Sequence, residues 1–317
     1  MNREFLMLAE VYDPAKHQVN GWYASEKLDG QRAFWDGGLS RGKPTDWVPW
    51  ANLERKVRPI STGLWSRYGN VIPAPDHWLD KLPKGIFLDG ELYCGNLQNL
   101  RKIVSRDIPS PALWDEVKYL IFESPGCEIF SNGRINNVNF KKNIVMEDCL
   151  SFLGIQHYCG YIFSKTLETL KKEVRTNKVV RVLEQVQLPQ GPMAAKDEVY
   201  TMLNGIVESG GEGLILRAPN SFWMPKRVKQ LLKVKPMLDS EGVVVGHTEG
   251  KNRLVGMLGA LVVEWKGVKF ELGTGLDDGD RYKELFPIGT KVRFKYTSLT
   301  NDGVPREARF DCIREDE

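Results

Sequence analysis

A lysine followed closely by an arginine, in Lys27-Leu28-Asp29-Gly30-Gln31-Arg32, is the segment of this chain best suited to chemistry. A lysine amine attacks an electrophile only when it is neutral. At a reference pKa of about 10.4, only about one lysine in a few thousand is neutral at pH 7. A site must therefore desolvate the amine or surround it with positive charge. Residues 21–26 predict a strand that ends at Lys27, and the turn pair Asp29-Gly30 follows, so we expect the amine at the mouth of a sheet with Arg32 close behind.

Two further segments carry paired charges in strand-like runs. In Phe87-Leu88-Asp89-Gly90-Glu91-Leu92, Asp89 and Glu91 are two residues apart and project to one face. Two carboxylates on one face repel unless a cation or hydroxyl groups meet them; solvated acids on an edge strand are the alternative. In Leu231-Leu232-Lys233-Val234-Lys235, two lysines share a face of a strand, which is costly without an anion such as phosphate.

An aromatic residue and a third carboxylate complete the set. Phe122, in Tyr119-Leu120-Ile121-Phe122-Glu123-Ser124-Pro125, offers a flat face to a purine, although a lone Phe in an apolar strand usually belongs to the core. In Glu212-Gly213-Leu214-Ile215-Leu216-Arg217, strand alternation places Glu212, Leu214 and Leu216 on one face and Arg217 on the other. We therefore expect Glu212 to be a metal ligand and Arg217 to be structural.

Taken in the order of the chain, the five segments resemble motifs I, III, IIIa, IV and V of the covalent nucleotidyltransferases. The fit is closest to the minimal viral and phage ATP-dependent DNA ligases and covers nearly the whole chain. The resemblance implies that Lys27 is the catalytic residue and takes AMP from ATP through a phosphoramide bond. It also implies an ATP site formed by Glu26, Lys27, Arg32, Glu91, Phe122, Leu214, Lys233, Lys235 and Arg306.

Within that implied site each residue has a role. Phe122 stacks on the adenine, and Leu214 closes the pocket opposite it. Glu91 contacts the ribose or a metal-bound water, and Mg²⁺ is held by Glu91 and Glu212. Asp89 supports its strand. Arg306, within Pro305–Arg314, matches a degenerate motif VI and orients pyrophosphate, with Arg309 and Arg314 as alternatives.

The implied partner is nicked double-stranded DNA, contacted by Arg32, Ser66, Arg67 and Arg227. Two segments match the Ser-Arg-x-Gly pattern of motif Ia, Ser40-Arg41-Gly42 and Ser66-Arg67-Tyr68-Gly69-Asn70. The second fits better in its spacing to Glu91 and in its continuation. Residues 41–65 then form an insertion rich in Trp and basic residues, which is either a DNA-facing loop or, more in keeping with its tryptophans, a packed cover.

The 317 residues predict two domains. Residues 1–238 mix strands (86–93, 117–122, 212–217, 231–235) with helices (97–106, 166–175, 196–208). Residues 239–317 hold five short strands (243–247, 259–265, 268–273, 290–297, 307–313) and one helix (277–286), a pattern typical of an OB-fold β-barrel. The expected class is α+β: an ATP-grasp-like nucleotidyltransferase (ligase adenylation) domain with antiparallel sheets, followed by the small OB-fold.

Composition narrows the setting. The five cysteines form no CxxC pair, so neither a zinc site nor a disulfide framework is expected. The absence of a signal-peptide pattern and of a long apolar run favours a cytoplasmic protein without a membrane span, and a monomer is the default expectation. The net charge of +3 is too small to demonstrate a nucleic-acid partner. Replication, repair and phage recombination stay open as roles.

Three other functions remain to be distinguished. An RNA ligase or a GTP-dependent mRNA-capping enzyme shares motif I, although the Ser-Arg-x-Gly segment and the missing Arg-x-Asp-Lys ending favour a DNA ligase. A non-catalytic nucleic-acid-binding protein is the alternative from another class. The joint presence of Lys27, Glu91, Glu212, Lys233 and Lys235 argues against it.

Overall fold

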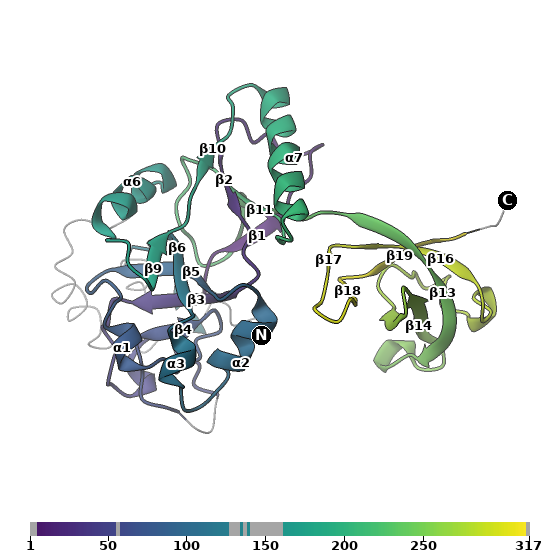
Figure 1. Ribbon diagram of the computed structural model, residues 1–317, viewed down its shortest axis with the longest axis horizontal. Coiled ribbons are helices and arrows are strands. Elements are labelled where there is room, and N and C mark those ends of the chain that lie inside the picture. Colours follow the sequence, from purple (N-terminus) through teal and green to yellow (C-terminus); the bar gives the residue numbers. More distant parts are fainter. Residues whose placement is uncertain (1–4, 55–57, 127–133, 136–137, 140–160, 315–317) are drawn as a thin grey trace. The chain divides into compact units, whose positions relative to one another are not determined.

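The computed structural model describes residues 5–54, 58–126, 134–135, 138–139 and 161–314. The chain divides into two compact units, Met1–Val234 and Lys235–Glu317, close to the boundary predicted after residue 238 (Figure 1). Among the described residues, no helix is both long and apolar enough to cross a membrane. Cys94 and Cys312 carry free thiols.

The first unit is built on two five-stranded sheets, which we call sheet 1 and sheet 2. Sheet 1 has the order β1-β12-β11-β2-β10, with β1 (Leu8–Val11), β12 (Arg227–Val234), β11 (Leu214–Arg217), β2 (Tyr23–Glu26) and β10 (Val186–Gln187). Sheet 2 has the order β4-β3-β5-β6-β9, with β4 (Leu64–Ser66), β3 (Gln31–Asp36), β5 (Phe87–Tyr93), β6 (Lys118–Glu123) and β9 (Val180–Val182). All pairings are antiparallel except β1 with β12 and β6 with β9.

Five helices and one short hairpin complete the described part of this unit. The helices are α1 (Asp76–Leu79), α2 (Leu97–Val104), α3 (Pro111–Trp114), α6 (Phe163–Glu173) and α7 (Pro192–Glu208), and the hairpin pairs β7 (Arg134–Ile135) with β8 (Val138–Asn139). Helix α2 starts at Asn96, whose side chain accepts a hydrogen bond from the Asn99 N–H and so satisfies one of the exposed donors of the first turn. Its apolar residues Leu100, Ile103 and Val104 are buried, as the helical spacing predicted.

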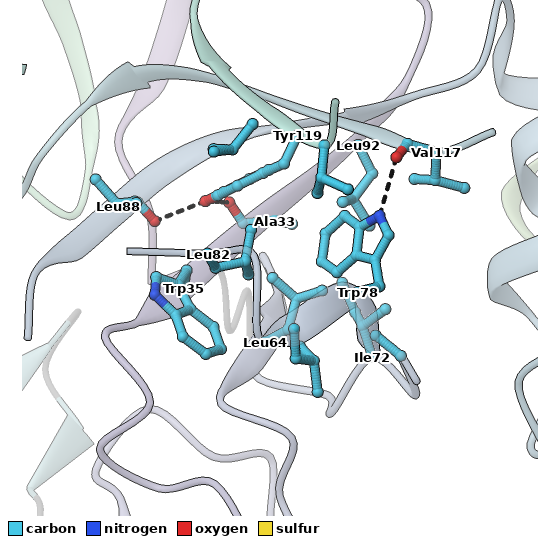
Figure 2. Packing of buried hydrophobic residues seen from close by; sticks show 14 of the residues in the cluster. Ala33, Trp35, Leu64, Ile72, Trp78, Leu82, Leu88, Leu92, Val117 and Tyr119 are labelled. Carbon is cyan, nitrogen blue, oxygen red and sulfur yellow. Dashed lines mark hydrogen bonds between the residues drawn. The ribbon is translucent and has the colours of Figure 1, made fainter. Parts of the chain in front are cut away.

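One face of sheet 2 carries the largest core, to which α1, α2 and α3 contribute (Figure 1). Figure 2 shows how the polar ends of its large side chains are satisfied: the Trp78 indole donates to the Val117 carbonyl over 2.9 Å, and the Tyr119 hydroxyl lies 2.9 Å from the Leu88 carbonyl. Buried indole and phenol groups usually have such partners, because an unpaired polar atom is costly away from water. This core makes sheet 2 a rigid support.

A second core contains Trp50 and Trp65 together with Phe34 and Phe87 of sheet 2. Trp50 is 4% exposed and Trp65 is fully buried. The parts of the segment 41–65 around Trp50 and Trp65 are therefore packed against sheet 2, as the packed-cover alternative predicts. Its basic residues Arg55 and Lys56 lie outside the described residues.

Sheet 1 is covered by α7. Leu214 and Leu216 of β11 pack with Ala195 and Val199 of α7, and all four side chains are fully buried. Helix α7 starts with Pro192 in its first turn, where the missing N–H is not needed.

The second unit is an antiparallel five-stranded sheet in the order β15-β14-β13-β16-β19. The strands are β13 (Leu238–Glu249), β14 (Leu258–Trp265), β15 (Val268–Leu272), β16 (Lys291–Tyr296) and β19 (Arg309–Ile313), and a small hairpin pairs β17 (Ser298–Leu299) with β18 (Pro305–Arg306). The five predicted strands are all present. Within the described residues β15 and β19 do not pair, so the expected barrel is not closed, although the Phe310 N–H donates to the Thr274 carbonyl just beyond β15.

The helix predicted over residues 277–286 is wrong. The structure has only a short 3-10 turn there, Lys283–Leu285. Asp277 and Asp280 instead exchange hydrogen bonds, each side chain accepting from the other's backbone N–H. Asp side chains that bond to nearby backbone groups compete with the helix, and here the turn prevails.

Candidate active site

Lys27 lies directly after β2, where sheet 1 ends. Its backbone N–H donates to the Gly213 carbonyl over 2.8 Å, which ties the lysine to the segment that leads into β11. Its Nζ lies 2.6 Å from Oε2 of Glu212, and both side chains are largely buried. The structure thus brings together the predicted nucleophile and one predicted metal carboxylate, although 185 positions separate them in sequence.

A glycine holds the lysine turn against sheet 2. A Cβ on Gly30 would lie 2.3 Å from the Leu92 carbonyl oxygen and 2.7 Å from Cγ of Glu91. Real Cβ atoms do not approach a backbone oxygen so closely, so only glycine fits at this crossing. The turn that carries Lys27 therefore lies directly against β5 and Glu91.

Glu91 lies among several charges. Burial raises the pKa of its carboxyl from 4.5 to about 8; Arg32 and Lys27 act in the opposite direction, while Asp89 and Glu212 raise it further. Lys27 and Glu212, which lie next to sheet 1, are thus near enough to Glu91 of sheet 2 for their charges to act on its carboxyl.

Asp89 binds Arg32, as expected of a residue that supports its strand. The register pairs Arg32 of β3 with Glu91, so Asp89 is its diagonal neighbour. The Arg32 Nε and Nη2 atoms donate to the two Asp89 oxygens over 2.5 and 2.6 Å, and Asp89 is fully buried. The indole Nε1 of Trp223 also donates to Asp89, over 2.9 Å. No feature of the sequence indicated Trp223.

Phe122 stands at a β-bulge. Asp89 pairs with Glu123 and Gly90 with Ile121, so Phe122 has no partner on β5. Bulges re-aim side chains and occur beside active sites. The guanidinium carbon of Arg32 lies 4.7 Å from the centre of the Phe122 ring. Phe122 is partly exposed rather than a core residue, so its ring is available to a ligand.

The predicted orientation of β11 is wrong. Leu214 is fully buried against α7, so it offers no surface to a base, and Arg217 is not turned away from the site. Arg217 Nη2 donates to Glu123 Oε2 of β6 over 2.9 Å, and both side chains are buried. Glu212 precedes the strand, since Gly213 interrupts the extended conformation with a φ of 145°. The alternation holds within β11, but the face toward sheet 2 is that of Ile215 and Arg217.

Ile215 was missed by the sequence reasoning. It is partly exposed and shares its strand face with Arg217. In the register of sheet 1 it pairs with Ser25 of β2 and with Lys233 of β12. The sequence held a signal for this face. An arginine buried within a strand requires a carboxylate partner, and Glu123, which directly follows Phe122, is such a partner for Arg217. That pairing turns the face of Arg217 and Ile215 toward Phe122.

The two lysines of the last motif differ in their positions. Lys233 lies within β12 and is partly buried, and Lys235, also partly buried, directly follows the end of β12 at Val234. In the second unit, Lys235 Nζ lies 2.6 Å from Oε1 of Glu307, the neighbour of Arg306 on β18. Glu26, at the end of β2, is exposed.

The arginines predicted to contact DNA differ in the residues to which they are bound. Arg41 donates to Asp76 and Asp80, each over 2.6 Å, so its charge is balanced by two carboxylates. Arg67 is exposed at the turn after β4, where its guanidinium lies 4.7 Å from the centre of the Tyr68 ring and Ser66 Oγ accepts the Asn70 N–H. Arg227 is exposed at the start of β12 and donates to the Ala9 carbonyl.

The carboxylates of the site suit Mg²⁺ as its partial ligands. Among the described residues, no group of three or more His, Cys, Asp or Glu side chains could hold a metal ion by itself. Mg²⁺ is commonly bound by one or two carboxylates together with substrate phosphates and water. Glu91 and Glu212 fit that mode, and they do not fit a structural metal centre.

Comparison with known proteins adds independent information. The family model of the ATP dependent DNA ligase domain matches residues 6–235, and that of the DNA ligase OB-like domain matches residues 249–314. A DNA ligase of Haemophilus influenzae is 25% identical over 309 residues, which cover 96% of this chain and 90% of the relative.

Two solved structures are also similar. One, from a structure-function analysis of Lig E DNA ligases that bind DNA with a minimal scaffold, is 28% identical and has a TM-score of 0.72; 98% of each chain is covered. Another, named Pmar-Lig_PreS3, is 22% identical with a TM-score of 0.69, and the match covers 98% of this chain and 68% of the other. The second likeness concerns the fold alone.

Proposed function

The chain belongs to the ATP-dependent DNA ligase family, and we propose that Lys27 is the residue through which it takes AMP from ATP. The predicted family, the α+β fold class and the enzyme class are thereby confirmed. The protein is an ATP-dependent DNA ligase with a nucleotidyltransferase domain and an OB-like domain, and its substrate is DNA. The assignment of individual residues is our proposal.

The observation that carries this assignment is the pair formed by Lys27 and Glu212 beside Glu91. The Lys27 nitrogen attacks the α-phosphorus of ATP; an N–P bond forms, and the bond to the leaving pyrophosphate breaks. Mg²⁺ on Glu91 and Glu212 would neutralise phosphate charge in this step. For the attack Lys27 must lose its proton and leave Glu212. The turn at Gly30, which follows Lys27, lies directly against Glu91.

The remaining site residues bind and orient the nucleotide. Phe122 stacks on adenine, and Ile215 replaces Leu214 as the apolar wall supplied by β11. Lys233 binds phosphate from β12. Lys235 and Arg306 are the proposed contacts of the departing pyrophosphate, for which Lys235 must leave Glu307. Fixed cations of this kind lower the barrier because they are in place before charge develops.

The DNA step is proposed for a nick with a 3′-hydroxyl and a 5′-phosphate in duplex DNA. AMP passes from Lys27 to the 5′-phosphate, and the 3′-hydroxyl then attacks that phosphate and releases AMP. Arg67 with Ser66, Arg227 and Arg32 are the proposed phosphate contacts. Arg67 is favoured over Arg41 because two carboxylates already balance the charge of Arg41. The free thiols of Cys94 and Cys312 are in keeping with a reducing, cytoplasm-like compartment.

Labelled nucleotides test the assignment. The protein is incubated with Mg²⁺ and radiolabelled ATP, GTP or NAD, and label from ATP alone is expected on the protein. Label from GTP would instead indicate a capping-type enzyme. Lys27→Ala should lose this label yet retain some sealing of pre-adenylated nicks, because the last step does not use the amine. Label on Lys27→Ala would place the nucleophile elsewhere.

A further inference from the structure

The indole of Trp223 joins the β11–β12 connection of sheet 1 to β5 of sheet 2 through a hydrogen bond to Asp89. Trp223 lies in the connection between β11 and β12 of sheet 1, and it is 5% exposed. Its Nε1 donates to Oδ2 of Asp89, which lies on β5 of sheet 2 and is fully buried. A hydrogen bond to a buried carboxylate contributes more free energy than one between neutral groups. Its loss leaves a carboxylate oxygen with one hydrogen bond fewer in a place that water does not reach.

The contact continues into the site through Arg32. Asp89 accepts two hydrogen bonds from the Arg32 guanidinium, one on each oxygen, which fixes the plane of that group. The same guanidinium lies over the Phe122 ring. Phe122 is the bulged residue of β6 and pairs with no residue of β5, so Arg32 is one of the contacts that define how its ring stands.

We propose that Trp223 is a positioning residue for ATP: through Asp89 it orients Arg32, and Arg32 orients the Phe122 ring on which adenine stacks. This rests on the proposed role of Phe122. Trp223 touches neither nucleotide nor DNA in this scheme. Its indole N–H holds the Asp89 carboxylate in the one orientation that presents both oxygens to the Arg32 fork.

The position of Trp223 explains why an indole is present rather than another aromatic residue. The rings of Trp223 pack in the core that contains Phe34 and Phe87, and these apolar surroundings also suit a phenylalanine ring. Only the N–H distinguishes the indole from an apolar ring, and it meets a carboxylate that already binds a guanidinium. The function of the residue can therefore be tested by removing one hydrogen-bond donor.

The chain offers a matched control. Trp114 is fully buried in the largest core of the first unit, and its Nε1 has no hydrogen-bond partner in the described structure. Trp114→Phe therefore removes a buried indole without removing a hydrogen bond, whereas Trp223→Phe removes both. The difference between the two variants isolates the contact with Asp89.

The experiment measures self-adenylation against ATP concentration for wild type, Trp223→Phe and Trp114→Phe, with Tm as the folding control. We expect Trp223→Phe to raise the KM for ATP roughly tenfold, the usual consequence of losing one hydrogen bond to a charged group. Trp114→Phe should stay within about twofold of wild type. Sealing of pre-adenylated nicks by Trp223→Phe should fall less than its self-adenylation with limiting ATP.

A second pair of measurements separates positioning from general damage. If Trp223 acts through Arg32, adding Trp223→Phe to Arg32→Lys should change the KM for ATP by less than about twofold, because the fork that it orients is already lost. Replacing the Trp223 indole by its sulfur isostere benzothienylalanine keeps the ring shape without the N–H. It carries the test if Trp223→Phe does not fold.

Three results would overturn the inference: an unchanged KM in a folded Trp223 variant, equal effects of the two tryptophan substitutions, or full additivity with Arg32→Lys. These results are distinguishable from a failure of the proposed function, since that would appear as wild-type protein that takes no label from ATP or as label retained by Lys27→Ala.

Discussion

Asp36 provides a prediction whose size follows from the structure. It ends β3, is fully buried, and accepts hydrogen bonds from Ser40 Oγ over 2.5 Å and from Trp65 Nε1 over 3.0 Å. Burial raises the pKa of its carboxyl from 3.8 to about 6, although these hydrogen bonds lower it. We predict that replacing Asp36 with Asn removes a pH-dependent term from the unfolding free energy.

The sign follows from proton binding. The folded state binds the Asp36 proton more tightly than the unfolded state, so its contribution to stability is fully present below pH 3.8 and is lost as the pH rises through about 6. A shift of about two pKa units corresponds to about 3 kcal/mol. At about pH 4.5, which lies above the unfolded-state pKa, part of this contribution to stability is already lost. Raising the pH from about 4.5 to about 7.5 should therefore remove about 2 kcal/mol.

The assay is urea unfolding of wild type and Asp36→Asn at both pH values, followed for the first unit. The stability of the wild type relative to the variant should fall by about 2 kcal/mol from the lower to the higher pH. Asp107→Asn, a change at an exposed carboxylate of the same unit, should leave the difference nearly constant. A relative stability of Asp36→Asn that changes by less than about 0.5 kcal/mol would refute the reasoning.

Three further substitutions test the site. Gly30→Ala places a Cβ against the Leu92 carbonyl, so it should lower the unfolding free energy by about 1–3 kcal/mol and impair labelling by ATP; wild-type labelling would contradict the close approach. Phe122→Ala should weaken ATP use by about 1–3 kcal/mol while Tm shows a folded protein, and unchanged ATP dependence would remove Phe122 from the pocket. Arg67→Ala should keep self-adenylation, impair nick sealing and reduce the salt slope of nicked-DNA binding by about one unit, whereas Arg41→Ala should mainly lose up to about 1 kcal/mol of stability; a sealing defect confined to Arg41→Ala would reverse the two assignments.

The sequence predicted several of the strands that carry the site, but not β3, which holds Arg32 directly after the predicted turn. Lys27 follows β2, Glu91 lies in β5 and Lys233 lies in β12, as their patterns indicated. Strand alternation indicates only that successive side chains point to opposite faces of the sheet. It does not state which face meets a second sheet, and for this reason Leu214 was assigned to the pocket although it packs against α7.

Other contacts had no local signal. The bond between Trp223 and Asp89 joins residues 134 positions apart, and a tryptophan in a loop is compatible with many environments. The mutual hydrogen bonds of Asp277 and Asp280 show the opposite case, in which short-range polar chemistry prevailed over an apolar spacing that suggested a helix. In both cases the structure depends on which polar groups form hydrogen bonds with one another, and the periodicity of the sequence does not indicate this.

The proposed ATP site contains buried charges that are unfavourable for stability. Burial raises the pKa of Glu91 to about 8 and that of Glu123 to about 7, even though each has an arginine close by. Apolar residues of similar volume in place of such pairs are often neutral or stabilising. A core selected for stability alone would therefore not contain Arg32, Asp89, Arg217 and Glu123 together. Phosphoryl transfer requires fixed charges before the substrate arrives, because charges that must reorganise during the step lose much of their effect. The buried pairs supply that rigidity: they fix the strand that presents Glu91 and the ring of Phe122 where the two sheets meet, beside Lys27 and its partner Glu212.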